Sequence, residues 1–260
     1  MGFVDLHTHT CFCDGKSTPR EMVESAISLG VQTLGILSHS CVDFDPSASV
    51  AADKEALFVE EVRALAREYE GKIKILAGTE RDIYTTGIGA DYDYVIGAIH
   101  YYKTEDGYIP IDITKDMLVL LVERYFSGDF DSFAEDYYSK VSTLPELTGA
   151  NIIAHIDLIT KFNEDGSLFD TKSPRYVSAY RKAIDELVKK DVIFEINTGA
   201  ISRGYRTSPY PSSDIYEYIK QSGGGFILSS DAHKAENIAY SFKKYENLIE
   251  NTPILQDIIK

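Results

Sequence analysis

The chain has 260 residues, of which 44% are hydrophobic, so it can bury the core of one large α/β domain. Its 26 basic and 41 acidic residues give a formal net charge of −15 without a basic stripe, which argues against binding to long nucleic acids. Because no apolar run approaches the ~20 residues that span a bilayer, and because the opening stretch MGFVDLHTHT is too polar for a secretory signal, we expect a soluble cytoplasmic protein without a membrane partner.

Apolar segments alternate with helical patterns along the chain. Most of these segments are continuous runs, as is typical of strands buried on both faces of a parallel sheet. The predicted strands are residues 2–6, 33–37, 73–78, 94–99, 151–154, 192–196 and 226–229. Strands separated by helices with short connections predict a closed or nearly closed parallel barrel, and a doubly wound open sheet is the structural alternative.

The first predicted helix, residues 17–30, has clear signals at both ends. Thr18 fits the N-cap and Pro19 the first helical position. Glu21 completes a capping box with Thr18, and Gly30 fits the end of the helix. Further helices are predicted at residues 53–71, 174–190, 212–222 and 235–249.

A longer segment departs from this simple alternation. Residues 114–144 carry two amphipathic helical patterns, which are broken near Ser127. No linker rich in Pro, Gly or Ser and no low-complexity run divides the chain. We therefore expect a single domain over residues 1–260, with a helical insertion at about residues 104–148.

All six histidines fall at or just after the carboxyl end of a predicted strand. They are His7, His9, His39, His100, His155 and His233. Glu80 takes the equivalent place after the third strand, in KILAGTE. A single histidine there is usually a hydrogen-bonded core or loop residue, but a whole set at the end of a barrel where active sites form indicates a metal site.

The spacing of these residues indicates more than one ion. His7 and His9 alternate along a strand, so their side chains point the same way and can hold one ion between them. Asp14 lies on the following loop and can reach a neighbouring ion, and Glu80 can bridge two. Asp231 and His233 repeat the alternate spacing after the last strand. The pattern predicts a polynuclear cluster without assigning ligands to individual ions.

The segments DLHTHT, LSHS, GTE, IGAIH, AHIDLI, EINT and SSDAH, in this order, resemble the PHP family of metal-dependent phosphoesterases over roughly residues 3–240. Three stretches, AHIDLITKF, EINTGAISRGYRTSPYP and GGGFILSSDAH, are most similar to histidinol-phosphate phosphatases. The resemblance implies a distorted (β/α)7 barrel that holds three divalent ions, which are zinc, manganese or iron.

The resemblance also implies which residues hold each ion. The first ion would be bound by His7, His9, Glu80 and Asp231. Glu80 would bridge to a second ion that His100 and His155 also bind, and the third ion would be bound by Asp14, His39 and His233. Many relatives carry a histidine at the position of Asp14.

In these phosphatases a basic residue after the HxD stretch and an arginine after EIN hold the phosphate. The corresponding residues are Lys161 and Arg203, although the second spacing is one residue longer than in many relatives, so Arg206 competes with Arg203. Ordinary surface charge is the alternative for each of them.

Several residues have less specific predicted roles. Tyr101, Tyr102, Tyr205 and Tyr210 can wall a substrate pocket or simply pack, and Asp43 or Asp45 can meet a substrate amine. Asp5, Asp157 and Asn197 can support the metal ligands. Cys11, Cys13 and Cys41 are too few for a disulfide framework and are expected to pack as small hydrophobes, with some sensitivity to oxidation.

The expected reaction is hydrolysis of L-histidinol phosphate to L-histidinol and phosphate, a step of histidine biosynthesis. A hydroxide that bridges the ions would attack phosphorus directly, with Glu80 and Asp231 as catalytic ligands. His233 or a metal-bound water would protonate the leaving group. The sequence does not identify the oligomeric state.

Three alternatives remain open. The first is another PHP phosphoesterase that acts on small phosphoesters or short nucleic acids. The second is an amidohydrolase-like metal hydrolase, although no lysine ends a middle strand. The third is a metal-binding domain without activity.

Overall fold

The computed structural model describes residues 2–86 and 89–249. Seven parallel strands form one sheet in the order β1-β2-β3-β4-β7-β8-β9. They are β1 (Phe3–Asp5), β2 (Val31–His39), β3 (Lys74–Asp82), β4 (Tyr94–Ala98), β7 (Ile152–Ile153), β8 (Ile193–Asn197) and β9 (Gly225–Ser229). Each predicted strand overlaps one of these strands.

The first and last strands lie next to each other, so the sheet nearly closes on itself. A parallel bridge joins Thr8 to Ala232 just past β1 and β9. The carboxylate of Asp5 accepts hydrogen bonds from the backbone N of Ser230 (3.1 Å) and from its hydroxyl (2.5 Å). The expected distorted (β/α)7 barrel is therefore confirmed, and the doubly wound open sheet is excluded.

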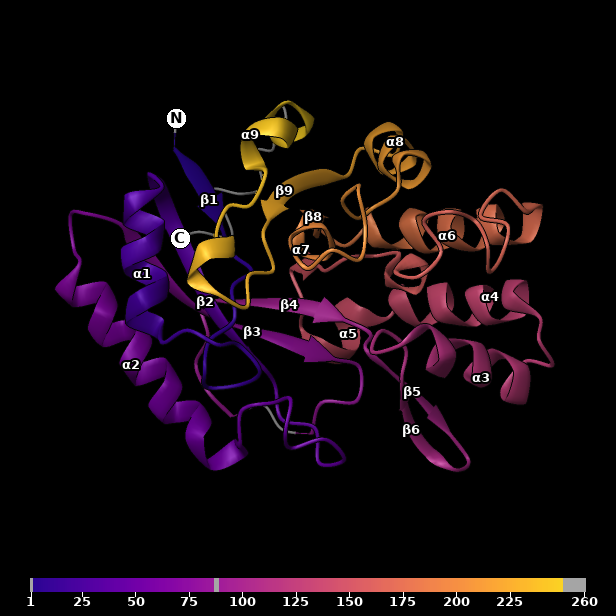
Figure 1. Cartoon of the computed structure of the whole chain (residues 1–260), viewed down its shortest axis with the longest axis horizontal. Coiled ribbons are helices and arrows are strands. Elements are labelled where there is room, and N and C mark those ends of the chain that lie inside the picture. Colours follow the sequence, from indigo (N-terminus) through magenta and orange to yellow (C-terminus); the bar gives the residue numbers. More distant parts are fainter. Residues whose placement is uncertain (1, 87–88, 250–260) are drawn as a thin grey trace.

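Helices surround the barrel, with α1 and α2 on one side and α3, α4 and α6 on the other (Figure 1). The α-helices are α1 (Pro19–Ser28), α2 (Glu55–Glu68), α3 (Lys115–Tyr125), α4 (Phe130–Val141), α5 (Leu144–Thr148), α6 (Pro174–Leu187), α7 (Gly199–Ser202), α8 (Ser213–Gln221) and α9 (Phe242–Tyr245). The 3-10 helices are η1 (Ala52–Lys54), η2 (Leu158–Thr160), η3 (Ala235–Asn237) and η4 (Glu246–Ile249). No helix in the described ranges is long and apolar enough to cross a membrane.

The predicted capping box at the start of α1 is present. The backbone N of Glu21 donates to the Thr18 hydroxyl (3.3 Å), and the backbone N of Thr18 donates to the Glu21 carboxylate (2.7 Å). Two orphan donors at the helix start are thereby satisfied.

The single helix predicted at residues 235–249 is wrong. The segment forms η3, α9 and η4, because Ala239 and Ser241 have positive φ values of 51° and 58°. The backbone N of Ala239 donates to the buried carboxylate of Asp5 (3.0 Å). This tertiary contact takes an amide that a continuous helix would use internally.

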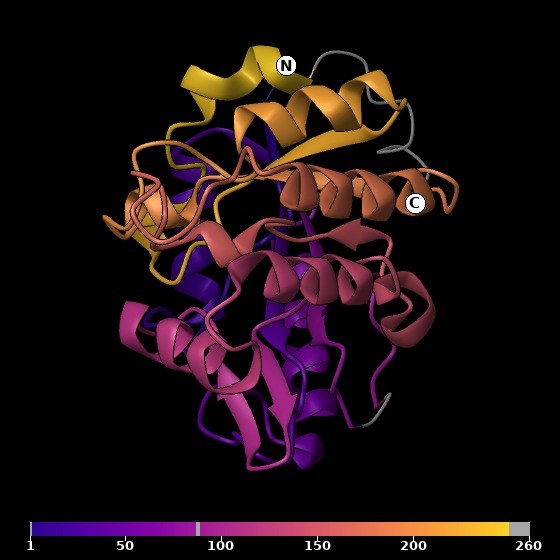
Figure 2. The same cartoon turned by 90° about the vertical axis from the view of Figure 1, so that its right-hand side faces the viewer.

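The insertion between β4 and β7 is not purely helical. It begins with an antiparallel hairpin of β5 (Tyr101–Thr104) and β6 (Gly107–Pro110), which the sequence did not predict. The helices α3 and α4 follow, as expected from the two amphipathic patterns, and the short helix α5 comes after them. Figure 2 shows this layer of helices, in which α4 packs against α6 and α6 against α8.

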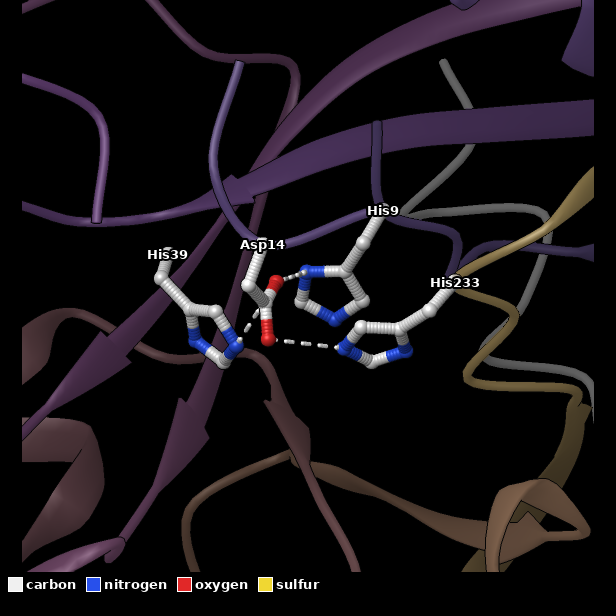
Figure 3. A group of neighbouring side chains, drawn as sticks. All are labelled: His9, Asp14, His39 and His233. Carbon is white, nitrogen blue, oxygen red and sulfur yellow. Dashed lines mark hydrogen bonds and ion pairs between the residues drawn. The ribbon is translucent and has the colours of Figure 1, made fainter. Parts of the chain in front are cut away.

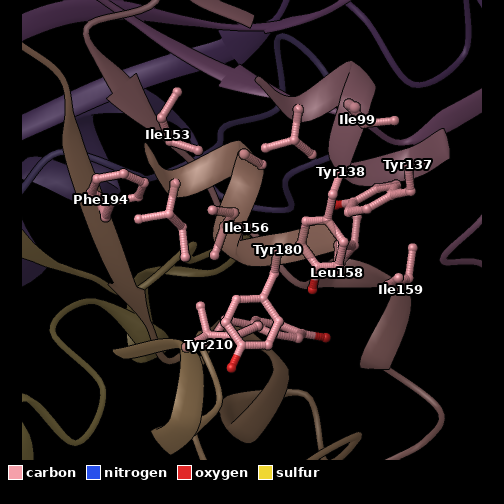
Figure 4. Close-up of a cluster of buried hydrophobic side chains, with 14 of the residues drawn as sticks. Ile99, Tyr137, Tyr138, Ile153, Ile156, Leu158, Ile159, Tyr180, Phe194 and Tyr210 are labelled. Carbon is pink, nitrogen blue, oxygen red and sulfur yellow. The ribbon is translucent and has the colours of Figure 1, made fainter. Parts of the chain in front are cut away.

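The insertion and the barrel share an apolar core. Tyr137 and Tyr138 of α4 belong to the same buried cluster as Ile153 of β7 and Phe194 of β8 (Figure 4). Shared burial of this kind favours one folding unit. The predicted extent of the domain, residues 1–260, includes positions outside the described residues.

Below the carboxyl ends of its strands, the barrel interior is filled by side chains. The ring of Tyr94 crosses this interior, and its hydroxyl donates to the backbone O of Leu6 (2.6 Å). A Cβ at Gly35 or Gly78 would overlap that ring, so both positions require glycine for the close approach. The barrel interior is therefore packed with apolar side chains beneath the polar residues.

Candidate metal centre at the carboxyl ends of the strands

Glu80 lies at the centre of the predicted ligands. It is 1% exposed, near the end of β3, and its Oε2 lies 3.2 Å from His7 Nε2, 3.4 Å from His9 Nε2 and 3.2 Å from His39 Nδ1. Its other oxygen, Oε1, lies 3.2 Å from His155 Nε2 and 3.4 Å from His100 Nε2. One buried carboxylate thus presents its two oxygens to two different groups of imidazoles, as a bridging ligand must.

Asp231 completes the first of these groups. Its Oδ1 lies 3.7 Å from His7 Nε2 and 3.6 Å from His9 Nε2. The structure therefore brings together the four residues that were expected to hold the first ion. Because His7 and His9 come from the end of β1 and Asp231 from the end of β9, the closure of the barrel builds this group.

A second group surrounds Asp14, which is drawn with its neighbours in Figure 3. Its Oδ2 lies 3.1 Å from His233 Nε2, and its Oδ1 lies 3.8 Å from both His39 Nε2 and His9 Nδ1. The Oδ1 atom is buried and has no hydrogen-bond partner among residues 2–86 and 89–249. An unsatisfied buried carboxylate oxygen among imidazole nitrogens fits a bound cation.

His39 lies between the two groups. Its Nδ1 faces Glu80 and its Nε2 faces Asp14, and a neutral imidazole has only one lone pair to offer a metal. The donor atoms of His39, Glu80 and His100 lie within 4.8 Å of one another, as do those of His9, Asp14, His39 and His233. The geometry permits His39 to serve either ion, and its assignment to the third ion stays a prediction.

The charge around the ligands suits a metal. Burial, together with His233 and His39, lowers the pKa of His9 to about 3, and burial lowers the pKa of His100 to about 4 despite the charge of Glu80. Burial opposes ionisation of Glu80, but His7, His39 and His100 hold its pKa well below the ordinary value. His9 and His100 are thus neutral imidazoles beside an ionised carboxylate, and divalent transition metals prefer such donors, so these residues fit a metal cluster.

Glu195 is a buried residue of this region that the sequence did not identify. Its Oε1 lies 2.6 Å from His7 Nδ1, whereas the other ring nitrogen, Nε2, faces His9 and Glu80. Burial alone would lower the pKa of His7, but the carboxylates of Glu195, Glu80 and Asp231 raise it well above its ordinary value. The sequence signal that could have identified Glu195 is an acidic residue inside the apolar run VIFEIN.

Other carboxylates support the backbone around the ligands. Asp82, which was not predicted, accepts a hydrogen bond from the backbone N of His100 (2.7 Å), and burial raises its pKa to about 7. Asn197, as predicted, contacts the Asp231 carboxylate (3.4 Å). Asp157 instead accepts a hydrogen bond from the backbone N of Ser212 (2.9 Å), so it stabilises the loop before α8 rather than a ligand.

The three predicted phosphate-binding residues have different surroundings. Arg203 reaches the cluster: its Nη2 donates to Asp231 Oδ2 (2.9 Å), and its Nη1 lies 3.2 Å from His233 Nδ1. Lys161 pairs with the carboxylate of Asp112 (3.1 Å), a residue that lines the same cavity as Glu80 and His100.

Arg206 has its guanidinium bound elsewhere. It donates to the hydroxyl (2.7 Å) and backbone O (3.0 Å) of Thr160 and stacks over the ring of Tyr210. With 6% of its surface exposed, it has the contacts of a buried structural residue.

The comparisons with known proteins agree with this geometry. The family model of the PHP domain matches residues 5–199. The chain belongs to the PHP family. It is 27% identical over 255 residues to a probable histidinol-phosphatase of Deinococcus radiodurans, covering 93% of this chain and 90% of the relative. It is 24% identical over 268 residues to the histidinol-phosphatase of Bacillus subtilis, covering 93% of this chain and 97% of the relative.

A solved structure shows the same fold. The histidinol phosphate phosphatase of Lactococcus lactis, in complex with zinc, L-histidinol and phosphate, aligns with a TM-score of 0.71 and 22% identity, covering 95% of this chain and 92% of that one. The resemblance to the PHP family and to its histidinol-phosphatase type is therefore confirmed, and the family's metal dependence accords with the ligand cluster described above.

The mouth of the PHP site is lined by residues of the loop after β2 and by Tyr101 of β5. The ring of Phe44 stacks on Tyr108 at a centroid distance of 3.7 Å, and the hydroxyl of Tyr101 donates to Asp45 (2.8 Å). Tyr101 and Asp45 thus engage each other at the mouth. Tyr210 is buried, and Tyr205 is exposed with the ammonium of Lys161 over its ring.

Proposed function

We propose that this PHP protein is a metal-dependent phosphomonoesterase that hydrolyses L-histidinol phosphate to L-histidinol and phosphate, as a step of histidine biosynthesis. The observation that carries the proposal is the convergence of the metal ligands on Glu80 with Arg203 at their edge. A guanidinium beside a cation cluster is suited to the oxygens of a phosphate ester. The relatives named as histidinol-phosphatases, which align over nine tenths of the chain, support the choice of substrate.

We propose three divalent ions of zinc, manganese or iron. His7, His9, Glu80 and Asp231 would hold one of them, Glu80, His100 and His155 the second, and Asp14, His39 and His233 the third. When bound, these ions would neutralise the phosphoryl oxygens and acidify the attacking water.

The protein's own side chains would orient the ester. Arg203 and Lys161 would bind the phosphate oxygens, and Arg206 would position the loop that carries Arg203. The imidazole of His233, which lies between Asp14 and Arg203, would deliver a proton to the leaving alkoxide if Asp14 and His39 hold the third ion without it, and otherwise a water would deliver that proton. Glu80, Asp231 and His233 are thus the proposed catalytic residues.

The test is a comparison of substrates on one preparation. The purified protein, reconstituted with manganese or zinc, should hydrolyse L-histidinol phosphate with a kcat/KM at least 100-fold above that of p-nitrophenyl phosphate. A Glu80→Ala variant should be inactive on both. Equal rates on the two esters, or faster release of phosphate from a short oligonucleotide, would reject histidinol phosphate and favour another PHP phosphoesterase. The cytoplasmic location stays a prediction.

A further inference from the structure

Glu195 is a buried acid whose described contacts include no lysine or arginine. It lies in β8 with 1% of its surface exposed, and its Oε1 lies 2.6 Å from His7 Nδ1. Its other oxygen, Oε2, accepts from the backbone N of His155 (3.3 Å) and from Asn197 Nδ2 (3.0 Å). Placing a carboxylate here costs desolvation energy that an apolar side chain would avoid, so burial alone does not account for it.

The partners of Glu195 link it to three proposed ligands. It contacts His7 through the ring and His155 through the backbone, and Asn197 extends the contact to Asp231 Oδ2 (3.4 Å). His7 and Asp231 belong to the first proposed ion and His155 to the second. One side chain therefore connects the ends of β1, β7, β8 and β9 beneath the site.

The chemistry of the contact fixes the proton on His7. An ionised carboxylate only accepts hydrogen bonds, so the ring must carry its proton on Nδ1, beside Glu195. The nitrogen that is left to bind a cation is Nε2, which is 3.1 Å from His9 Nε2 and 3.2 Å from Glu80 Oε2. The other tautomer would point an N–H at the place of the ion.

We propose that Glu195 is a positioning residue that fixes the tautomer and ring orientation of His7 and thereby sets the affinity of the His7–His9–Glu80–Asp231 site for its divalent ion. This inference rests on the proposed function only in requiring that the site binds a cation. Glu195 itself contacts neither ion nor substrate. Carboxylates behind a ligating histidine change metal affinity about 10- to 100-fold when they are removed.

The first experiment measures zinc affinity rather than activity. The metal-free forms of the wild type, Glu195→Gln, Glu195→Asp and Glu55→Gln would be titrated against a chromophoric chelator that competes for zinc. We expect the tightest site of Glu195→Gln to bind zinc about 10- to 100-fold more weakly than the wild type. The amide keeps the shape of the side chain but presents an N–H2 group either to His7 or to the donors on His155 and Asn197.

Two variants make the comparison specific. Glu195→Asp keeps the charge but retracts it from His7, so its zinc affinity should lie between those of the wild type and Glu195→Gln. Glu55→Gln removes another buried glutamate, which is 5% exposed and interacts with Arg81 rather than with a ligand. Its zinc affinity should equal that of the wild type. Wild-type affinity in a folded Glu195→Gln protein would overturn the proposal.

A second measurement does not depend on a variant that folds. Nitrogen-15 spectra of histidine-labelled, zinc-loaded wild-type protein should show His7 protonated at Nδ1 and bound to zinc through Nε2. Zinc bound through Nδ1 would overturn the proposal. If the wild type binds zinc but does not hydrolyse histidinol phosphate, the proposed function fails, while the role of Glu195 is still decided by these two readouts.

Discussion

Arg203 and Asp231 are joined by two hydrogen bonds from a single guanidinium. Arg203 Nη2 donates to the carboxylate Oδ2 (2.9 Å) and Nη1 to the backbone O of Asp231 (2.8 Å). Asp231 has a φ of 48°, which residues other than glycine seldom adopt. The guanidinium of Arg203 binds both the side chain and the backbone of this residue. The residue proposed to bind phosphate therefore also holds a metal ligand in place.

The contrast between the two arginines gives the first prediction. Arg203→Ala should lower kcat/KM for L-histidinol phosphate about 100-fold or more, because the variant lacks the preorganised cation that stabilises the charge developing on the phosphate. Arg206→Ala should instead lower the free energy of unfolding by about 2 kcal/mol, because it removes the two hydrogen bonds that the buried guanidinium donates to Thr160. Steady-state kinetics and urea unfolding would measure the two effects. If, at equal metal content, Arg206→Ala lost activity and Arg203→Ala lost only stability, Arg206 would be the phosphate-binding residue and Arg203 the structural one.

Lys161 gives the second prediction through its ion pair with Asp112. Its Nζ donates to the carboxylate (3.1 Å) and to the backbone O (2.5 Å) of that residue, with 9% of the lysine side chain exposed. Lys161→Met should raise KM about 10-fold and also destabilise the protein, because Asp112 is left without its cation.

A double variant separates these two effects of Lys161. Asp112→Asn, added to Lys161→Met, should restore much of the stability but not the KM. Recovery of both quantities would assign Lys161 a structural role only.

Much of the site could be read from the sequence because its ligands follow strands. A parallel barrel brings the carboxyl ends of all its strands to one face, so the order of strands and histidines was sufficient to predict their convergence. The order of strands could not decide whether Arg203 or Arg206 reaches the metal ligands. It depends on the short helix α7, after which Arg203 turns back to β9 while Arg206 points to Thr160.

Other features depend on contacts between distant parts of the chain. The contact of Glu195 with His7 spans 188 positions, and no local pattern records it. The helix predicted at residues 235–249 is broken where Asp5, at the other end of the chain, accepts the amide of Ala239. The β5–β6 strands are four residues each and half-buried, so their alternation carries little signal.

Removing the metal gives the third prediction. Incubation with a strong chelator should abolish phosphatase activity and lower Tm, since ions that bind only the folded protein stabilise it by about 4 kcal/mol at a thousandfold excess over Kd. Adding manganese or zinc back should restore both. Differential scanning calorimetry before and after chelation measures the shift in Tm. Full activity in protein shown to be metal-free by elemental analysis would contradict the proposed mechanism.

The fourth prediction concerns pH and the loop that follows Arg206. Burial would raise the pKa of Glu164, but hydrogen bonds from Ser208 and Thr207 hold it below the ordinary value of 4.5. A lowered pKa in the folded state stabilises the protein above pH 4.5, and this contribution is lost as the pH falls through the folded-state value. Glu164→Gln should therefore cost about 1 kcal/mol at pH 7, an amount limited by solvent screening.

The cost of Glu164→Gln should shrink as the pH is lowered below 4.5. Urea unfolding of the chelator-treated wild type and variant across this range measures the difference, and chelation keeps the pH dependence of metal binding out of the result. A cost that stays constant down to the lowest pH at which both proteins fold would show that the carboxylate charge is not involved.

The cysteines give the last prediction, which says which of two thiols near the site is the reactive one. Cys13 lies 3.5 Å from His9 Nδ1, but burial, with the nearby charge of Asp14, raises the pKa of its thiol to about 11. At pH 8 only about one molecule in a thousand then carries the reactive thiolate. Cys11 is exposed. Iodoacetamide should therefore modify Cys11 well before Cys13 in the native protein, and Cys11→Ser should keep its activity through the same treatment.

Peptide mass spectrometry identifies the modified residue, with unfolded protein as the control in which both react. Early modification of Cys13 in the native protein would show that the thiol beside His9 is accessible and ionised.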